Sequence, residues 1–163
     1  MTDINRKRPV PSSFGSVDPA PASIELSTEK SRHLLCDESE RMFIRMRALF
    51  SLRNIGGPEA IDGLVAGFSS SSALLKHEIA YVLGQMQDSY AVDALISRLS
   101  DVDEDDIVRH EAAEALGAIG DIRCIPTLMK FLEDESNVVS QSCEVAIDLL
   151  NWVNSDTLEY SSI

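Results

Sequence analysis

An internal repeat of about 33 residues constrains the fold of this chain more than any other feature. Three segments align by eye: MRALFSLRNIGGPEAIDGLVAGF from Met46, HEIAYVLGQMQDSYAVDALISRL from His77 and HEAAEALGAIGDIRCIPTLMKFL from His110. A fourth segment, CEVAIDLLNWV from Cys143, begins in the same phase and lacks the second half. The four starting positions are separated by 31, 33 and 33 residues. A period of this length predicts one helical hairpin per unit, which must stack on its neighbours to bury its apolar face.

Each unit has the same internal order. An apolar-periodic helix is followed by a Gly or Asp turn and by a second helix that ends near Phe68, Leu99 or Leu132. Within the first helices, Leu83 and Leu116 occupy matched positions that the helical period assigns to the core. The predicted fold is therefore all-α, a HEAT-like helical-repeat solenoid of about four helical hairpins.

The first 27 residues differ from the rest in composition. They contain four prolines among Ser, Gly and Ala: Pro9, Pro11, Pro19 and Pro21. Few large apolar residues accompany these prolines, so we expect residues 1–27 to form a flexible, disordered tail. The apolar period begins near Thr28, and residues 28–163 are predicted to form the repeat domain.

Composition excludes several classes of protein. The net charge is −13, from 27 acidic and 14 basic residues, so phosphate repulsion argues against a nucleic-acid partner. The acidic surface would attract a basic partner, but charge alone favours the simpler interpretation that it keeps the domain in solution. No apolar run approaches the ~18 residues of a membrane span, and the basic N-terminus has no apolar segment typical of a secretory signal. Three widely spaced cysteines, with no CxxC motif, indicate reduced thiols. We therefore expect a cytoplasmic protein with no membrane partner.

A His-Glu dipeptide recurs at the start of two repeat units. The two central units carry His77-Glu78 and His110-Glu111. The flanking units carry Met46-Arg47 and Cys143-Glu144 at the same positions. His-Glu is therefore specific to the central units and is not a general requirement of repeat packing.

Equivalent positions in a stack of repeats face the same way, so the two pairs should share one surface. Packed helices place them roughly 8–10 Å apart. Imidazole and carboxylate together are a ligand mixture that suits iron and related metals. Alternatively, each His packs locally and each Glu only favours a helix N-terminus. Because the pair recurs at an identical phase, we favour a metal site formed by His77, Glu78, His110 and Glu111.

Three further residues are weaker candidates. Glu114 lies four positions after His110 and could support a ligand or face a substrate, as could Tyr81 at the matched position of the earlier unit. For both residues, an ordinary surface role is the alternative. Cys143 occupies the phase of the two histidines, but the apolar residues around it predict a buried, inert thiol.

Several long segments resemble deoxyhypusine hydroxylase. The motifs LLKHEIAYVLGQMQD from Leu74 and VRHEAAEALGAIGD from Val108 look like the His-Glu motifs of that family. The segments DESERMFIRMRALFSLRNIGGPEA and SCEVAIDLL look like the start and end of its C-terminal half, and FGSVDPAPA looks like its inter-half linker. The resemblance covers about Phe14 to Trp152, nearly the whole chain.

The resemblance implies a function and a set of site residues. The family consists of HEAT-repeat di-iron monooxygenases that use O₂ to hydroxylate the deoxyhypusine side chain of a translation initiation factor, which completes hypusine. By motif matching, His77, His110 and Glu111 correspond to iron ligands, and Glu78 to a carboxylate that binds iron or lies near the substrate. Glu78, Ile107 and Glu114 are the implied substrate-facing residues. Ile107 lies in DIVR, where the family often has PMVR.

Members of the resembled family have two halves and four His-Glu motifs, whereas this sequence has one half and two motifs. Three explanations stay open. The chain is a fragment, or it pairs with a second chain (an identical copy or one that carries the N-terminal half), or it is a binding module without turnover. The alternative in the last case is a non-catalytic HEAT-repeat scaffold, similar to phycobilin-lyase-type repeat proteins, that only binds a protein.

Overall fold

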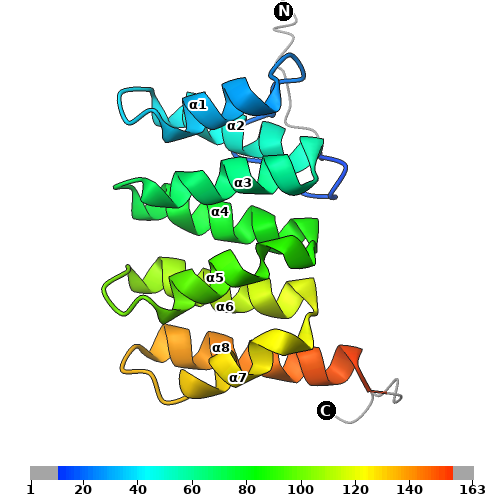
Figure 1. The fold of residues 1–163 in the computed structure, drawn as a ribbon, viewed down its shortest axis with the longest axis vertical. Helices are drawn as coiled ribbons and strands as arrows, with labels where there is room; N and C mark the ends of the chain where they lie inside the picture. Colours follow the sequence, from blue (N-terminus) through cyan, green and yellow to red (C-terminus); the bar gives the residue numbers. More distant parts are fainter. Residues whose placement is uncertain (1–10, 156–163) are drawn as a thin grey trace, which may run out of the picture.

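The computed structural model describes residues 11–155, which form eight α-helices and three single 3₁₀ turns without any β-strand (Figure 1). The helices are α1 (Thr28–Cys36), α2 (Met42–Ile55), α3 (Pro58–Ala66), α4 (Ala73–Met86), α5 (Val92–Ser100), α6 (Asp106–Ile119), α7 (Ile125–Lys130) and α8 (Asn137–Val153). The 3₁₀ turns are η1 (Gly67–Ser69), η2 (Ser89–Ala91) and η3 (Ile122–Cys124). In this part of the chain, no helix has both the length and the hydropathy needed to cross a membrane.

The helices stack as a solenoid of four hairpins, α1/α2, α3/α4, α5/α6 and α7/α8, along the long axis of the molecule (Figure 1). This confirms the predicted all-α repeat fold. We call α2, α4, α6 and α8 the inner layer, in which α4 packs on α6 and α6 packs on α8 along their lengths. The unit that begins at Met46 is not the start of the first hairpin, because α1 precedes it and packs on α2.

Short polar residues set the helix boundaries. The side chain of Ser72 caps α4 by accepting a hydrogen bond from the Leu75 amide (3.2 Å), and Asp105 caps α6 by accepting one from the Ile107 amide (3.0 Å). Helix α6 ends at Ile119 and is followed by Gly120, whose φ of 83° suits glycine. At the matched position, Gln87 adopts φ 51° and donates a hydrogen bond from its side chain to Ala118 O at 2.9 Å. The predicted turns are therefore confirmed.

Glycine allows the inner helices to approach closely. A Cβ atom on Gly84 would lie 2.9 Å from the Cα atom of Ala115, and one on Gly117 would lie 2.9 Å from the Cα atom of Ala146. Both glycines are buried and separated by one repeat, so the α4–α6 and α6–α8 contacts use the same packing. The core between the layers is aliphatic and includes Leu83 and Leu116, both fully buried as predicted.

The residue just before the position of the histidines is a cation in three repeat units. In each unit its side chain forms an ion pair with an acidic residue of a hairpin loop. The pairs are Arg45–Glu38, Lys76–Glu104 and Arg109–Asp134. Lys76 and Arg109 each reach the loop of the following hairpin, and Glu38 also accepts a hydrogen bond from Ser71 Oγ in the next loop (2.9 Å). These ion pairs join successive hairpins.

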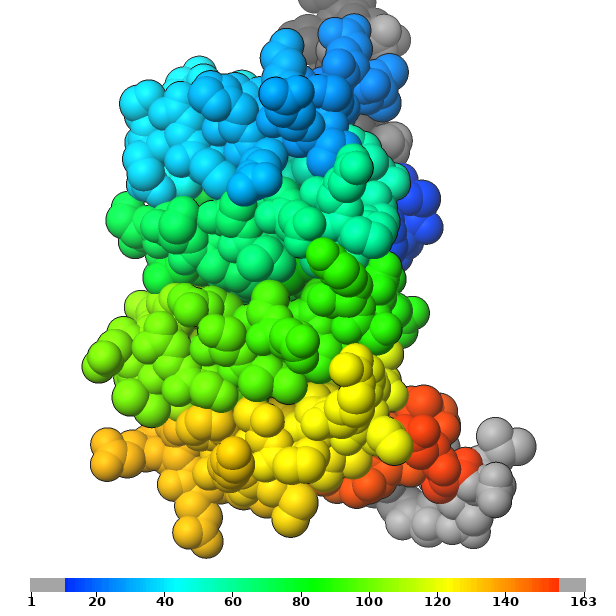
Figure 2. All heavy atoms as spheres, viewed as in Figure 1, coloured from blue at the N-terminus to red at the C-terminus, as the bar shows by residue number. Residues whose placement is uncertain are grey.

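Residues 11–23, which we call the N-terminal strap, lie against the stack. Figure 2 shows this segment in dark blue beside the bands that follow it in sequence. Asp18 binds Arg53 through two hydrogen bonds of 2.8 and 2.6 Å, the Ser23 amide donates to Ser51 Oγ at 2.9 Å, and Ala20 is buried. The strap has no helix, as expected for a tail, but these contacts fix it to α2. Residues 1–10 of the expected tail lie outside the described residues.

Candidate metal centre

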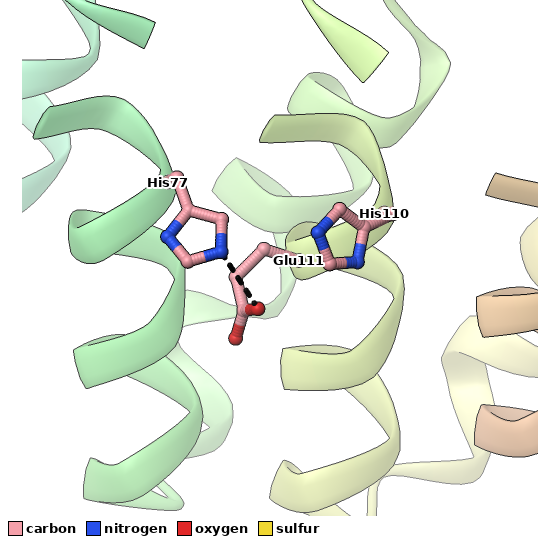
Figure 3. A group of neighbouring side chains, drawn as sticks. All are labelled: His77, His110 and Glu111. Carbon is pink, nitrogen blue, oxygen red and sulfur yellow. Dashed lines mark ion pairs between the residues drawn. The ribbon is translucent and has the colours of Figure 1, made fainter. Parts of the chain in front are cut away.

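The two His-Glu pairs lie side by side on the inner layer. His77 and Glu78 are in the second turn of α4, and His110 and Glu111 are in the second turn of α6. Figure 3 shows the two imidazoles extending toward each other across the gap between the helices, with the Glu111 carboxylate next to them. The prediction that the repeat places the pairs on one surface therefore holds for His77, His110 and Glu111.

Three of the four side chains converge. Among the described residues, one donor atom each from His77, His110 and Glu111 lies within 4.8 Å of the others, a spacing at which three ligands can share one ion. His77 Nε2 is 3.2 Å from Glu111 Oε2, and the imidazole centroids are 5.6 Å apart with an interplanar angle of 47°. Glu78 is not in this group of three.

The carboxylates change the protonation of their neighbours. The hydrogen bond that His77 donates to the Glu111 carboxylate raises the pKa of His77 above its ordinary value, although partial burial opposes this change. Burial raises the pKa of the Glu78 carboxyl, and the adjacent His77 opposes the increase. His77 and Glu78 therefore retain their protons more readily than isolated side chains, and a divalent cation would compete with those protons.

Beside Glu78 lies a second charged group that the sequence did not indicate. The side chain of Arg53 is fully buried and is held by Asp18 of the strap, and its guanidinium also donates to Gln85 Oε1 at 3.0 Å. Among the charges that affect Glu78, Arg53 lowers its pKa and Asp18 raises it. Gln85 in turn donates to the Tyr81 hydroxyl at 3.1 Å. The strap is thus connected to the edge of the site.

His110 has partners on the side away from His77. Its Nδ1 atom lies 3.4 Å from Ser142 Oγ on α8 and 3.4 Å from Glu114 Oε1. Ser142 donates to Glu114 Oε1 at 2.9 Å. Glu114 thus supports a candidate ligand, which was one of its two predicted roles. Ser142 was not predicted, although a small residue at the position of Lys76 and Arg109 was a visible departure from the repeat.

A groove of about 370 Å³ adjoins the site along the inner layer. Its lining comes from three helices: Tyr81, Gly84, Gln85 and Gln87 of α4 and its end, Glu111, Glu114, Ala115 and Ala118 of α6, and Val145, Ala146 and Leu149 of α8. The small residues form an apolar surface, while the two glutamates bring negative charge to it. Ile107 is partly exposed in the first turn of α6 and is not part of this lining.

Cys143 does not contribute to the site. The thiol is fully buried, and burial raises its pKa to about 11, so the sulfur is uncharged at neutral pH. This confirms the predicted buried thiol.

The fold and the repeat define the class to which the protein belongs. A model described as HEAT repeats matches residues 61–148, more than half of the chain, and one described as PBS lyase HEAT-like repeat matches residues 44–70. The chain belongs to the HEAT-repeat family.

Within that family, its relatives are deoxyhypusine hydroxylases. The chain is 52% identical to deoxyhypusine hydroxylase-B of Oryza sativa subsp. japonica over 145 residues, which cover 88% of this chain and 48% of that protein. It is 46% identical to the deoxyhypusine hydroxylase of Danio rerio, covering 91% of this chain and 48% of the relative. The structure of human deoxyhypusine hydroxylase in complex with glycerol matches with a TM-score of 0.84 and 45% identity, covering 88% of this chain and 50% of that one.

These comparisons confirm the resemblance found in the sequence. The chain spans about half the length of the curated relatives it matches.

Proposed function

We propose that the chain provides one half of an iron-dependent deoxyhypusine monooxygenase. The observation that carries the proposal is the convergence of His77, His110 and Glu111 on one face, in a sequence about half identical to proteins named deoxyhypusine hydroxylase. The proposed reaction is the O₂-dependent hydroxylation of the deoxyhypusine side chain of a translation initiation factor, which yields hypusine.

The donor set fits iron. Two imidazole nitrogens and one carboxylate oxygen are ligands that divalent iron accepts, and no thiolate belongs to the group. His77, His110 and Glu111 would hold the metal, while Glu78 would complete the set or contact the substrate. When bound, the iron would supply the O₂ activation that this chain's side chains cannot perform.

The groove supports a cationic, aliphatic substrate. Its small apolar residues suit a methylene chain, and the carboxylates of Glu111 and Glu114 suit an ammonium group. Deoxyhypusine combines these two features in one side chain. The formal charge of −13 would also attract a basic region of the partner protein.

A site that holds two irons needs more ligands than the three that converge here. Three convergent side chains leave much of the coordination sphere open, and the chain matches half of its relatives' length. We propose that a second copy of this chain, or a chain that carries the other half, faces the inner layer. Metal that binds the assembled form would then drive association by mass action.

The test begins with metal content. Protein loaded with ferrous iron under nitrogen should bind the metal, and His77→Ala and His110→Ala should each lose it with unchanged circular dichroism, because both side chains lie outside the core. Glu144→Ala is the control, since Glu144 occupies the repeat position of Glu78 and Glu111 in the last unit and is exposed. Equal iron content in the wild type and the histidine variants would contradict the proposed ligands.

Activity and assembly are measured on the same protein. Iron-loaded protein should hydroxylate a deoxyhypusine-bearing partner when O₂ and a chemical reductant that supplies two electrons per turnover are added. Light scattering should show a larger species with iron than without it. Turnover by an iron-loaded monomer would overturn the need for a second chain. Protein that binds no iron and shows no turnover would instead favour the non-catalytic scaffold.

A further inference from the structure

Ser142 lies at a position where the repeat otherwise places a long cation. Arg45, Lys76 and Arg109 hold this position in the first three units, and each pairs with a loop acid. Ser142 instead is buried and contacts α6, where its hydroxyl meets both Glu114 and His110. It is therefore a contact between α8 and the candidate metal centre.

Both polar neighbours of His110 Nδ1 are hydrogen-bond acceptors. The Ser142 hydroxyl has a single proton, and it donates that proton to the Glu114 carboxylate at 2.9 Å. Toward His110, the hydroxyl oxygen can then only accept, at 3.4 Å. The other neighbour of Nδ1 is Glu114 Oε1, also at 3.4 Å and also an acceptor when ionised. Both neighbours therefore favour a proton on Nδ1.

A neutral imidazole with its proton on Nδ1 has its free lone pair on Nε2. In Figure 3, one ring nitrogen of His110 points toward His77 and Glu111, while the ring's other nitrogen is directed away from them. The nitrogen directed away is Nδ1, because Nδ1 is the atom next to Ser142 and Glu114. The lone pair of Nε2 is therefore aimed at the space that the three donor atoms surround.

We propose that Ser142 and Glu114 are positioning residues that hold His110 in the Nδ1-protonated form, so that Nε2 is ready to bind the metal before the metal arrives. This inference rests on the proposed function for the identity of the metal, but the orientation and the protonated nitrogen are properties of the metal-free protein. The two candidate ligands are thus not equivalent. His77 is 3.2 Å from Glu111 through Nε2, and its Nδ1 has no hydrogen-bond partner in the described structure.

The first measurement identifies the protonated nitrogen directly. Long-range ¹H–¹⁵N correlation spectra of metal-free protein at about pH 8, where an ordinary imidazole is neutral, distinguish the two neutral forms. The sequence has three histidines, so His33→Gln and His77→Gln variants assign the signals. His110 should show the Nδ1-protonated form, and Ser142→Ala together with Glu114→Ala should produce a mixture of both forms.

The second measurement is the affinity for Fe²⁺ or Co²⁺. Removing the partner of a metal-binding histidine typically weakens metal binding about 10–100-fold. We expect a loss in this range for Ser142→Ala, with recovery in Ser142→Thr, which keeps the hydroxyl. Ser140→Ala is the control on the same helix, because Ser140 binds only the backbone oxygen of Leu132 and should have no effect.

The outcomes separate this inference from the proposed function. If the wild type binds no metal but shows Nδ1-protonated His110 that depends on Ser142 and Glu114, the proposed function fails and the positioning stands. Nε2-protonated His110 in the metal-free wild type would overturn the positioning. Unchanged spectra and affinities in the variants would also overturn it, even with full iron binding.

Discussion

At the residue scale, the carboxylate of Glu38 joins two hairpin loops. It accepts hydrogen bonds from Arg45 Nη2 at 2.9 Å and from the Ser71 hydroxyl at 2.9 Å, across the first two hairpins. Hydrogen bonds from Ser70, Arg45 and Ser71 lower its pKa from 4.5 to about 2. The ionised form of Glu38 is therefore the form that holds the loops together.

This pKa predicts an acid-dependent contribution to stability. A carboxyl whose pKa is lower in the folded state than in the unfolded state stabilises the fold at every pH above its ordinary pKa of 4.5. This stabilisation is lost as the pH falls from 4.5 toward about 2. Glu38→Gln should therefore lower the urea midpoint at about pH 7, and the difference from wild type should shrink at about pH 3. A difference of equal size at both pH values would show that the charge of Glu38 does not contribute.

Single residues also show how far the sequence could predict the site. The repeat phase placed His77, His110 and Glu111 together, because equivalent positions of stacked units share a face. It could not predict that Glu78 would lie outside the convergent group, since the repeat position of a residue does not determine its side-chain conformation. Nor could it predict the pairing of Asp18 with Arg53, which joins residues 35 positions apart through a segment with no periodicity.

At the element scale, Gly84 and Gly117 determine how closely the inner helices pack. Arg53 occupies the same repeat position in the first unit, so the α2–α4 contact lacks this glycine packing and contains a buried guanidinium instead. The close α4–α6 contact is also the contact that brings His77 to Glu111. Helix spacing and metal-site geometry are therefore coupled.

Gly84→Ala tests this coupling. The added Cβ would lie 2.9 Å from a backbone atom of α6, so we expect a loss of about 1–3 kcal/mol from overpacking and weaker metal binding. Without that clash, alanine would stabilise the helix by about 1 kcal/mol. The sign of the change in the free energy of unfolding therefore shows whether the close approach of α4 and α6 requires glycine. Gly63→Ala is the control, because its Cβ would meet side-chain atoms and no backbone atom of another helix: the two Leu52 methyl groups at 3.1 and 3.3 Å and Arg32 Cβ at 3.5 Å.

Most elements were predictable because the hairpin, its turn residues and its core leucines recur together. The grouping into hairpins was less predictable. The Met46 unit looked like the first, because α1 has no counterpart among the aligned segments. Contacts, not sequence similarity, show that α1 completes the first hairpin.

At the scale of the whole molecule, the N-terminal strap packs against the first hairpins of the stack. Its Asp18 carboxylate is the charged partner of the buried Arg53 guanidinium, whose other acceptors are the neutral Gln85 and Asn54 side chains. The Phe14 ring lies over the same guanidinium at 4.6 Å. The strap also contacts α4, because Gln85 Nε2 donates a hydrogen bond to Ser16 Oγ at 3.4 Å.

Asp18→Ala should destabilise the protein by about 3 kcal/mol, the lower end of the range for breaking a buried pair, because Gln85 and Asn54 still accept hydrogen bonds. Urea unfolding measures this loss. The double variant Asp18→Ala with Arg53→Met should recover much of it, since no buried charge then remains without its partner. A double variant as unstable as Asp18→Ala alone would mean that the strap acts through its other contacts.

The stacking of hairpins also has a consequence for how the protein is made. Each helix packs on helices one or two places away in sequence, so only short segments must close, little loop-closure entropy opposes folding, and rapid folding is expected. Repeats can therefore form one after another as the ribosome releases them. The candidate centre needs only α4 and α6 for its three convergent side chains. A nascent chain could thus form this cluster before α8, which carries Ser142, has been synthesised.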